Sequence, residues 1–231
     1  MNKKRCIHKI KNDCNQKTAF IILCGKKSNK KGYGNVPLTQ ITPKETIIDR
    51  QINAILNNYD NNEITLISGF EHDRIVNHIH SKKYENVRII ENQNYKSSTI
   101  LDGWRIGLNS ILKEDVYIIH GDRLFNESCI CNSQVNNTHA VVHKHDKNNY
   151  NLGLLFDEKK LINISYGLPY VWSEIFYIKK QHFDLVRNTI NSYRQKKIYN
   201  IESLINNISQ KIEISVVQRK QKDIKILKEI K

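Results

Sequence analysis

The stretch TAFIILCGKKSNKKGYGNVPL, residues 18–38, decides how the rest of the chain is interpreted. A short apolar run ends at Leu23, and Cys24 and Gly25 lead into a polar loop rich in lysine, serine, asparagine and further glycine. Glycine lets backbone amides approach an anion closely, so a strand that runs into such a loop is a common way to hold a phosphate. The stretch therefore predicts a phosphate-binding loop after a buried first strand.

Composition limits the class of protein. The chain has 231 residues, which suffices for one sizeable hydrophobic core without a disulfide framework. Five cysteines, an odd number, suit a reducing compartment, and no apolar stretch approaches the roughly 20 residues of a membrane-spanning helix. A soluble cytoplasmic protein is expected. The net charge of +14 attracts anions such as nucleotides, sugar phosphates or nucleic acid.

Hydrophobic periodicity predicts alternating strands and helices. Amphipathic helices are expected within residues 44–59, 71–83 and 97–112, the last with Ser97 or Ser98 as its N-cap. Short runs rich in isoleucine and valine predict strands at residues 20–23, 64–67, 87–90, 116–119, 139–143 and 212–217. The alternation predicts a parallel sheet with right-handed crossovers.

One α/β domain is the simplest organisation, because no linker, repeat or low-complexity tract divides the chain. Residues 18–231 are expected to form a single Rossmann-like domain whose mostly parallel central sheet is covered by helices on both faces. Residues 1–17 are a basic N-terminal extension. The runs between residues 132 and 177 are shorter and separated by turns, so a small antiparallel extension is predicted there.

The ends of the first and fourth predicted strands are where a ligand is expected, because open α/β sheets bind ligands at the carboxyl ends of their strands. The first strand ends in Leu23, Cys24 and Gly25, and the fourth is followed by Gly121 and Asp122. A carboxylate at that place offers the oxygen ligands that Mg²⁺ prefers. Asp122 is therefore the leading metal-ligand candidate. The alternative is that its side chain only stabilises a turn or caps the next helix.

Five segments resemble, in their order and spacing, the nucleotidyltransferases that make nucleotide-activated sugars, choline phosphate and related small phosphates. These segments are AFIILCGKKSNKKGYGNVPL, ETIIDRQINAI, EITLISGFEHDRIVNHI, VRIIENQNYKSSTILDGWRIGL and VYIIHGDRLF. The resemblance covers residues 18–125, with a weaker continuation to the C-terminus. It implies a fold of the nucleotidyltransferase type. It also implies Mg²⁺-dependent transfer of a nucleoside monophosphate to a sugar phosphate or amino-alcohol phosphate, with release of pyrophosphate.

The resemblance also implies roles for individual residues. Asp122 is the metal-binding aspartate and a catalytic residue, and Asp223 is a second metal ligand if the C-terminal motif slips by one residue. Lys27 is a catalytic cation, and Glu174 lies on the acceptor side. Residues 95–101 read the base, and the helix that includes residues 47–52 packs beneath the site. The implied nucleotide-binding set is Leu23, Cys24, Gly25, Lys26, Lys27, Ser28 and Thr99.

Several positions depart from the family pattern. Lys27 replaces the second glycine of the loop, where a side chain obstructs close approach to phosphate, and Asn29 replaces an arginine and its fixed positive fork. Val36 stands where the family has a phosphate-contacting lysine, and Lys225 stands at the second metal aspartate. Losing one electrostatic contributor costs about 2.7–4 kcal/mol of transition-state stabilisation. A partly degenerate active site is therefore expected.

A zinc site is an alternative for one short span. It holds ligand types suited to zinc, namely Cys129, Cys131, His139, His143 and His145. The two cysteines are separated by one residue instead of the two that are usual in zinc sites. Buried cysteines and surface histidines on an edge strand would account for the same residues without a metal.

The aromatic cluster of residues 170–180 has two interpretations. Trp172, Phe176 and Tyr177 stack on a ligand, or they pack in the core with Trp172 against a covering helix; packing is favoured because large aromatic residues mostly serve it.

A non-catalytic function is the alternative for the whole chain. In that interpretation the protein is an inactive relative that binds an anionic partner, either nucleic acid or a protein assembly, through its basic charge. No sequence signature of a nucleic-acid-binding fold is present.

Overall fold

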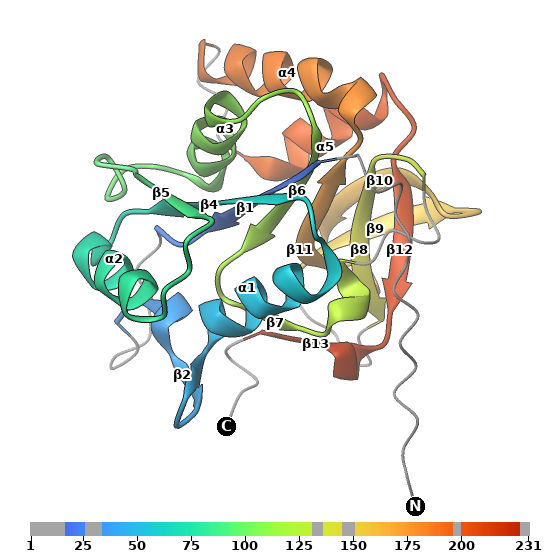
Figure 1. Ribbon diagram of the computed structural model, residues 1–231. Coiled ribbons are helices and arrows are strands. Elements are labelled where there is room, and N and C mark those ends of the chain that lie inside the picture. Colours follow the sequence, from blue (N-terminus) through green and yellow to red (C-terminus); the bar gives the residue numbers. More distant parts are fainter. Residues whose placement is uncertain (1–16, 26–33, 131–135, 145–150, 196–199, 227–231) are drawn as a thin grey trace, which may run out of the picture.

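The computed structural model describes residues 17–25, 34–130, 136–144, 151–195 and 200–226 (Figure 1). The helices are α1 (Ile47–Asn58), α2 (His72–Ser81), α3 (Ile100–Ser110), α4 (Phe183–Gln195) and α5 (Ile201–Ser209), with short 3-10 turns η1 (Val36–Leu38), η2 (Glu127–Cys129), η3 (Lys180–His182) and η4 (Gln221–Asp223). The strands are β1 (Thr18–Leu23), β2 (Gln40–Thr42), β3 (Glu45–Thr46), β4 (Asn62–Ser68), β5 (Val87–Glu91), β6 (Asp115–His120), β7 (Arg123–Phe125), β8 (His139–Lys144), β9 (Leu152–Asp157), β10 (Lys160–Tyr166), β11 (Tyr170–Ile178), β12 (Ser215–Arg219) and β13 (Ile224–Ile226).

Nine strands form one mixed sheet in the order β5-β4-β1-β6-β11-β8-β12-β10-β9. The first four are parallel, as the alternating pattern predicts, and β12 runs parallel to β8. The sheet is mixed, as expected, but its antiparallel part is larger than a small extension. β11 is antiparallel to both β6 and β8, and β10 is antiparallel to β9 and β12, so these two strands run opposite to the other seven.

Hairpin chemistry explains the larger antiparallel part. β9 and β10 are joined by Glu158 and Lys159, which have φ angles of 43° and 70°. Two successive residues with positive φ make the tight turn that reverses a strand beside itself. β9 also pairs with β11, so β11, β8, β12, β10 and β9 close into a ring of paired strands. The segment expected to be a small extension thus supplies four of the nine strands, β8, β9, β10 and β11.

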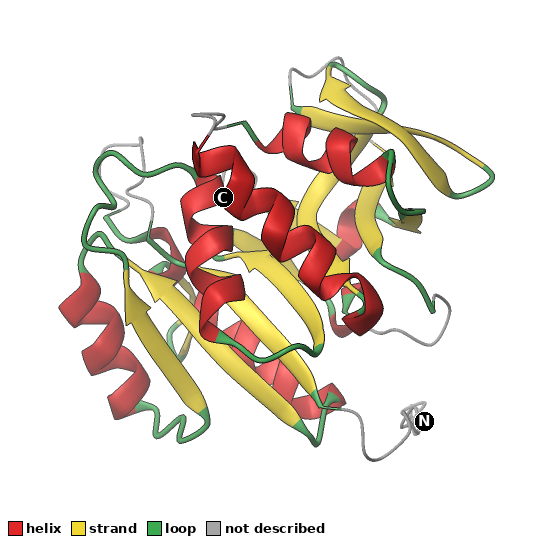
Figure 2. Cartoon of the chain, turned by 90° about the horizontal axis from the view of Figure 1, so that it is seen from above, coloured by secondary structure: helices red, strands yellow, loops and turns green. Residues whose placement is uncertain are grey.

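The core divides into two clusters because successive residues of a strand point to opposite faces. On β1, Ala19 and Ile21 belong to a cluster with residues of α3, α4 and α5. Phe20 and Ile22 belong to the other cluster, with residues of α1 and α2. Figures 1 and 2 show these helices around the parallel strands, with β1 and β6 in the middle.

Two helices begin with the same capping box. Thr46 and Asp49 cap α1, and Thr99 and Asp102 cap α3, each pair exchanging hydrogen bonds between side chain and backbone. The predicted N-cap of α3, Ser97 or Ser98, is therefore wrong by one or two residues. None of the described helices combines the length and the apolar character that a membrane-spanning helix needs.

Candidate functional site

The carboxyl ends of β1 and β6 lie side by side. The register pairs Leu23 with His120, and the amide of Gly121 donates a hydrogen bond to the carbonyl of Leu23 over 3.0 Å. A Cβ on Gly121 would stand 2.8 Å from that carbonyl oxygen and 2.9 Å from Cγ of Pro37, so only glycine fits without a shift. The geometry confirms that the bend after the first strand and the Gly-Asp after the fourth are neighbours.

The chain leaving β1 is held against the end of β4. The amide of Cys24 donates to the carbonyl of Ile67 over 2.8 Å, and the carbonyl of Gly25 accepts from the amide of Phe70 over 3.1 Å. Cys24 is buried, and burial together with the neighbouring charge of Asp122 raises the pKa of its thiol far above the usual range. A thiol in that state is not a nucleophile. The predicted phosphate contacts Lys26, Lys27 and Ser28 lie outside the described residues, as does Asn29.

The segment expected to read the base lies next to this bend. Gly69 lies between Tyr95 and the bend and allows them to approach closely. A Cβ at this position would stand 2.6 Å from Cβ of Tyr95 and 3.0 Å from the carbonyl oxygen of Gly25. Asn92 donates from Nδ2 to Oγ of Ser98 over 2.8 Å and so fixes the turn before α3. The hydroxyl of Thr99 is engaged in the capping box of α3, where it donates to Asp102 over 3.1 Å.

Four ionisable side chains gather where β6 ends: His120 is its last residue, Asp122 and Arg123 follow it, and Glu174 belongs to the neighbouring β11. His120 Nδ1 lies 2.5 Å from Oε2 of Glu174, Arg123 pairs with the same oxygen, and Nε of Arg123 lies 3.6 Å from Oδ1 of Asp122. Among the described residues, His120, Asp122 and Glu174 form the single group of three ligand-bearing side chains, with one ligand atom of each within 4.8 Å of the others. Glu174 thus faces the metal candidate Asp122.

The ionisation of Glu174 is set by two opposing effects. Burial raises the pKa of its carboxyl, but the charges and hydrogen bonds of His120 and Arg123 outweigh burial and hold the pKa well below its usual range. Glu174 is therefore a carboxylate at neutral pH. Its neighbours His120 and Arg123 were not among the predicted site residues. The signal that reveals them is a histidine closing an otherwise apolar strand, with Gly-Asp-Arg directly after it.

Helix α1 supports this turn from beneath, as the resemblance implied. Gln51 is fully buried and its Nε2 donates to the carbonyls of His120 and Arg123, over 2.9 Å and 2.6 Å. One side chain therefore fixes both ends of the turn that carries Asp122.

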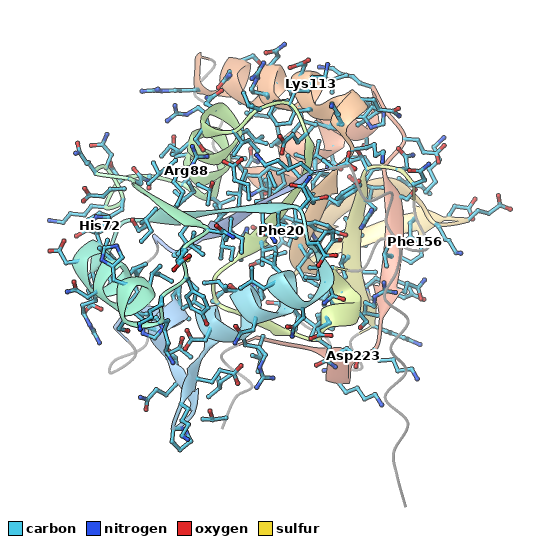
Figure 3. The ribbon with its side chains drawn as sticks, viewed as in Figure 1. Phe20, His72, Arg88, Lys113, Phe156 and Asp223 are labelled. Carbon is cyan, nitrogen blue, oxygen red and sulfur yellow. The ribbon has the colours of Figure 1, made fainter. Side chains whose placement is uncertain are left out.

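Asp223 lies elsewhere. The register of β13 with β7 pairs Ile226 with Arg123 and Ile224 with Phe125, so Asp223 lies beyond Phe125. There the Oδ1 atom of Asp223 accepts a hydrogen bond from Nδ2 of Asn126 over 2.9 Å. Four residues of extended chain separate that place from Asp122, which corresponds to about 13 Å. Figure 3 shows Asp223 next to β13. The expected metal site of Asp122 with Asp223 is thus not assembled.

Val36 cannot replace the family lysine, because it is buried against Ile47. The side chain of Lys225 lies outside the described residues.

The zinc alternative receives no support from the part that is described. Cys129 is buried, and burial raises the pKa of its thiol to about 11. His139 stacks on Tyr177 with a ring separation of 4.8 Å, and Nδ1 of His143 lies 3.1 Å from Oγ of Ser173. These three candidates form no metal group within the described ranges, and Cys131 and His145 lie outside them.

The aromatic residues of β11 serve packing, as favoured from the sequence. Trp172 is buried and lies edge-to-face with Trp104 of α3 at 6.4 Å, while Tyr177 is buried in the opposite cluster.

Comparison with solved structures finds nucleotidyltransferases. CTP:phosphocholine cytidylyltransferase from Streptococcus pneumoniae aligns with a TM-score of 0.76 at 12% identity, over 91% of this chain and 93% of that one. A putative glucose-1-phosphate thymidylyltransferase from Bacillus anthracis gives 0.70 at 16% identity, over 87% of each chain. The inositol-1-phosphate CTP transferase from T. maritima gives 0.66 at 10% identity, over 88% and 86%.

Likeness at this identity shows the fold, which is that of these nucleotidyltransferases. No protein-family model and no curated protein matches the sequence.

Proposed function

We propose that the chain is a nucleotidyltransferase that transfers a nucleoside monophosphate from a nucleoside triphosphate to a small phosphorylated acceptor. In this proposal β5, β4, β1 and β6 form a Rossmann-like half with the nucleotide at its carboxyl edge. One observation carries it: the bend from Leu23 to Gly25 and the carboxylate of Asp122 adjoin at that edge, in a fold shared with nucleotidyltransferases. A sugar phosphate or an amino-alcohol phosphate is the proposed acceptor.

The reaction would be a single displacement. An oxygen of the acceptor phosphate forms a bond to the α-phosphorus, and the bond from that phosphorus to the bridging oxygen breaks, so that pyrophosphate leaves with both electrons. Such a reaction requires alignment and charge neutralisation more than covalent chemistry by the protein. The backbone of Gly25 would hold phosphate oxygens, because the amide of Cys24 is already bonded to Ile67. The loop lysines Lys26 and Lys27 would supply the charge of the missing arginine.

A divalent cation fits the donor types present. Asp122 brings a carboxylate whose Oδ1 is buried without a hydrogen bond among the described residues. When bound, such an ion neutralises phosphate charge. The role of Asp122 is to hold the ion, and Gln51 keeps the turn of Asp122 in place from the core side.

The test is pyrophosphate release. The full chain is incubated with each common nucleoside triphosphate and with pooled sugar phosphates and amino-alcohol phosphates, in the presence of Mg²⁺ or Mn²⁺. Asp122→Ala should lower turnover at least about 100-fold, without lowering the unfolding midpoint, since its side chain is 42% exposed. Asp157→Ala, an exposed aspartate on β9, is the matched control and should keep full turnover.

Two results would contradict the proposal. One is the absence of pyrophosphate release with every pair of substrates. The other is unchanged turnover in Asp122→Ala. Thermal unfolding with nucleotide is measured in parallel, because stabilisation without turnover would favour the non-catalytic alternative.

A further inference from the structure

We propose that a polar cleft between the β2–β3 hairpin and α2 binds a phosphate-bearing small molecule. The cleft has a volume of about 470 Å³, and its two walls, α2 and the hairpin, lie next to each other in Figure 1. Ligand sites in proteins commonly have a volume of this order. Neither Asp122 nor the ends of β1 and β6 belong to the lining, so this is a second site that does not depend on the proposed nucleotidyl transfer.

Basic side chains border the cleft on both walls. On α2, Arg74 and His78 are four residues apart, and Lys82 caps the helix after a further four, so the three lie on one face. Lys44 belongs to the turn of the hairpin. Nζ of Lys82 donates a hydrogen bond to the carbonyl of Lys44 over 2.8 Å and so joins the two walls. An anion in the cleft would therefore meet positive charge from α2 and from the hairpin.

The two carboxylates of the lining are already bonded within the protein. Nε and Nη2 of Arg50 donate to the two oxygens of Glu45. Asp49 is only 2% exposed; it accepts a hydrogen bond from the amide of Thr46 over 2.9 Å, and it lies 2.9 Å from Nε2 of His78. These acids offer few acceptors to a ligand, and a metal ion would have to displace their present partners.

The groups that remain for a ligand are hydrogen-bond donors. Lys44 and Arg74 are exposed, and Arg74 pairs with Glu71 through Nη1 alone within the described chain. Arginine binds phosphate through paired donors and lysine binds it as a point charge. A ligand with several phosphate oxygens therefore fits the cleft better than a cation does. With their partners included and His78 taken as neutral, the cations outnumber the carboxylates by one: Lys44, Arg50, Arg74 and Lys82 against Glu45, Asp49 and Glu71.

Titration of the full chain with pyrophosphate tests the site. The protein is kept free of divalent cations and nucleotide, the ionic strength is fixed, and amide NMR signals and calorimetry report binding. We expect the amide signals of Gln40, Thr46 and Asn77 to shift, because these residues line the cleft. Glycerol 3-phosphate is titrated in parallel. Whichever of the two binds more tightly shows whether the ligand is a polyphosphate or a phosphate monoester.

The double variant Lys44→Gln with Arg74→Gln should weaken this binding at least about tenfold, because each substitution removes a charged donor. Both side chains are exposed, so this variant should fold as the parent does. Lys180→Gln with Lys211→Gln is the matched control. It removes the same charge at exposed positions outside the cleft and should bind as the parent does.

Four results would overturn the proposal. One is the absence of binding of both probes, and another is equal affinity in the parent and the double variant. The third is equal weakening in the control, because net charge alone would then account for binding. The fourth is a shift confined to the amide signals of Gly25 and Gly121, which would place the anion at the ends of β1 and β6. Because neither a nucleoside triphosphate nor a divalent cation is present, these outcomes are separate from the outcome of the pyrophosphate-release assay.

Discussion

At the scale of single residues, Gly121 determines how closely the ends of β1 and β6 approach. Its amide is bonded to the carbonyl of Leu23, and the space for a Cβ is occupied by that carbonyl, by Pro37 and by Sγ of Cys24 at 3.2 Å. Two of these contacts belong to backbone or to a rigid ring, which cannot move aside as a flexible side chain does. Glycine is required here because the ends of β1 and β6 approach each other closely, and this contact fixes the position of the turn that carries Asp122.

Gly121→Ala should therefore destabilise the protein by about 1–3 kcal/mol, the usual cost of inserting an atom into a well-packed place. Urea denaturation measures the change. Gly103→Ala on α3 is the matched control, because its Cβ would meet the flexible end of Leu23 at 3.1 Å while the helix gains up to about 1 kcal/mol from alanine. Equal effects of the two substitutions would show that the turn of Asp122 is not sterically limited.

At the scale of elements, Asp49 joins α1 to α2. Its carboxylate accepts from the amide of Thr46 over 2.9 Å at the start of α1, and it lies 2.9 Å from Nε2 of His78 and 3.4 Å from Nζ of Lys82. Burial raises the pKa of Asp49, but the hydrogen bonds from His78 and Thr46 outweigh it and hold the pKa far below the usual range. The carboxylate form therefore contributes stability above the unfolded pKa of about 4, and this contribution is lost as the pH falls further.

Asp49→Ala should lower the free energy of unfolding by about 1–3 kcal/mol at pH 7, because it removes a cap and leaves buried partners unsatisfied. The difference from the parent should shrink as the pH falls below about 4. Asp102→Ala removes the same capping box from α3, where the carboxylate is more exposed and has one further partner, Arg105, at 3.6 Å. Asp102→Ala should lower the free energy of unfolding by only about 1 kcal/mol. If urea denaturation shows the same loss of unfolding free energy for Asp49→Ala and Asp102→Ala, the contacts of Asp49 with α2 do not contribute to stability.

At the scale of the whole molecule, the two halves of the sheet meet where β11 lies between β6 and β8. His139 of β8 is buried there against Tyr177 and Tyr117, with ring separations of 4.8 Å and 6.1 Å. Burial lowers the pKa of His139 to about 4. Protonation then favours the unfolded chain, so its contribution to stability is complete above the unfolded pKa of about 6.5 and declines between that pH and 4.

His139→Phe keeps an aromatic ring at this place and removes the titration. The parent should lose up to about 3 kcal/mol more stability than this variant when the pH is lowered from 7 to 4, at about 1.36 kcal/mol per pKa unit. Urea denaturation over that range measures the difference, and His80→Phe, at an exposed position of α2, should behave as the parent does. Parallel pH profiles for the parent and His139→Phe would contradict the assignment.

The sequence by itself determined the alternating strands and helices of the parallel half of the fold and the place of the candidate site. Apolar runs and helical spacing are local signals, and they identify β1, β4, β5 and β6 as strands that alternate with helices. Leu23 and Asp122 were candidates because one ends the first of these strands and the other follows the fourth, and β1 and β6 are neighbours in the sheet.

Only the tertiary structure decided that Glu174 faces His120, that Asp223 does not reach Asp122, and that β11 joins the parallel strands to the ring that includes β8, β9, β10 and β12. These features depend on the register between strands far apart in the chain, and a shift of one residue turns a side chain to the other face. The bulge at Glu174 is such a shift of register, and no local sequence pattern predicts it.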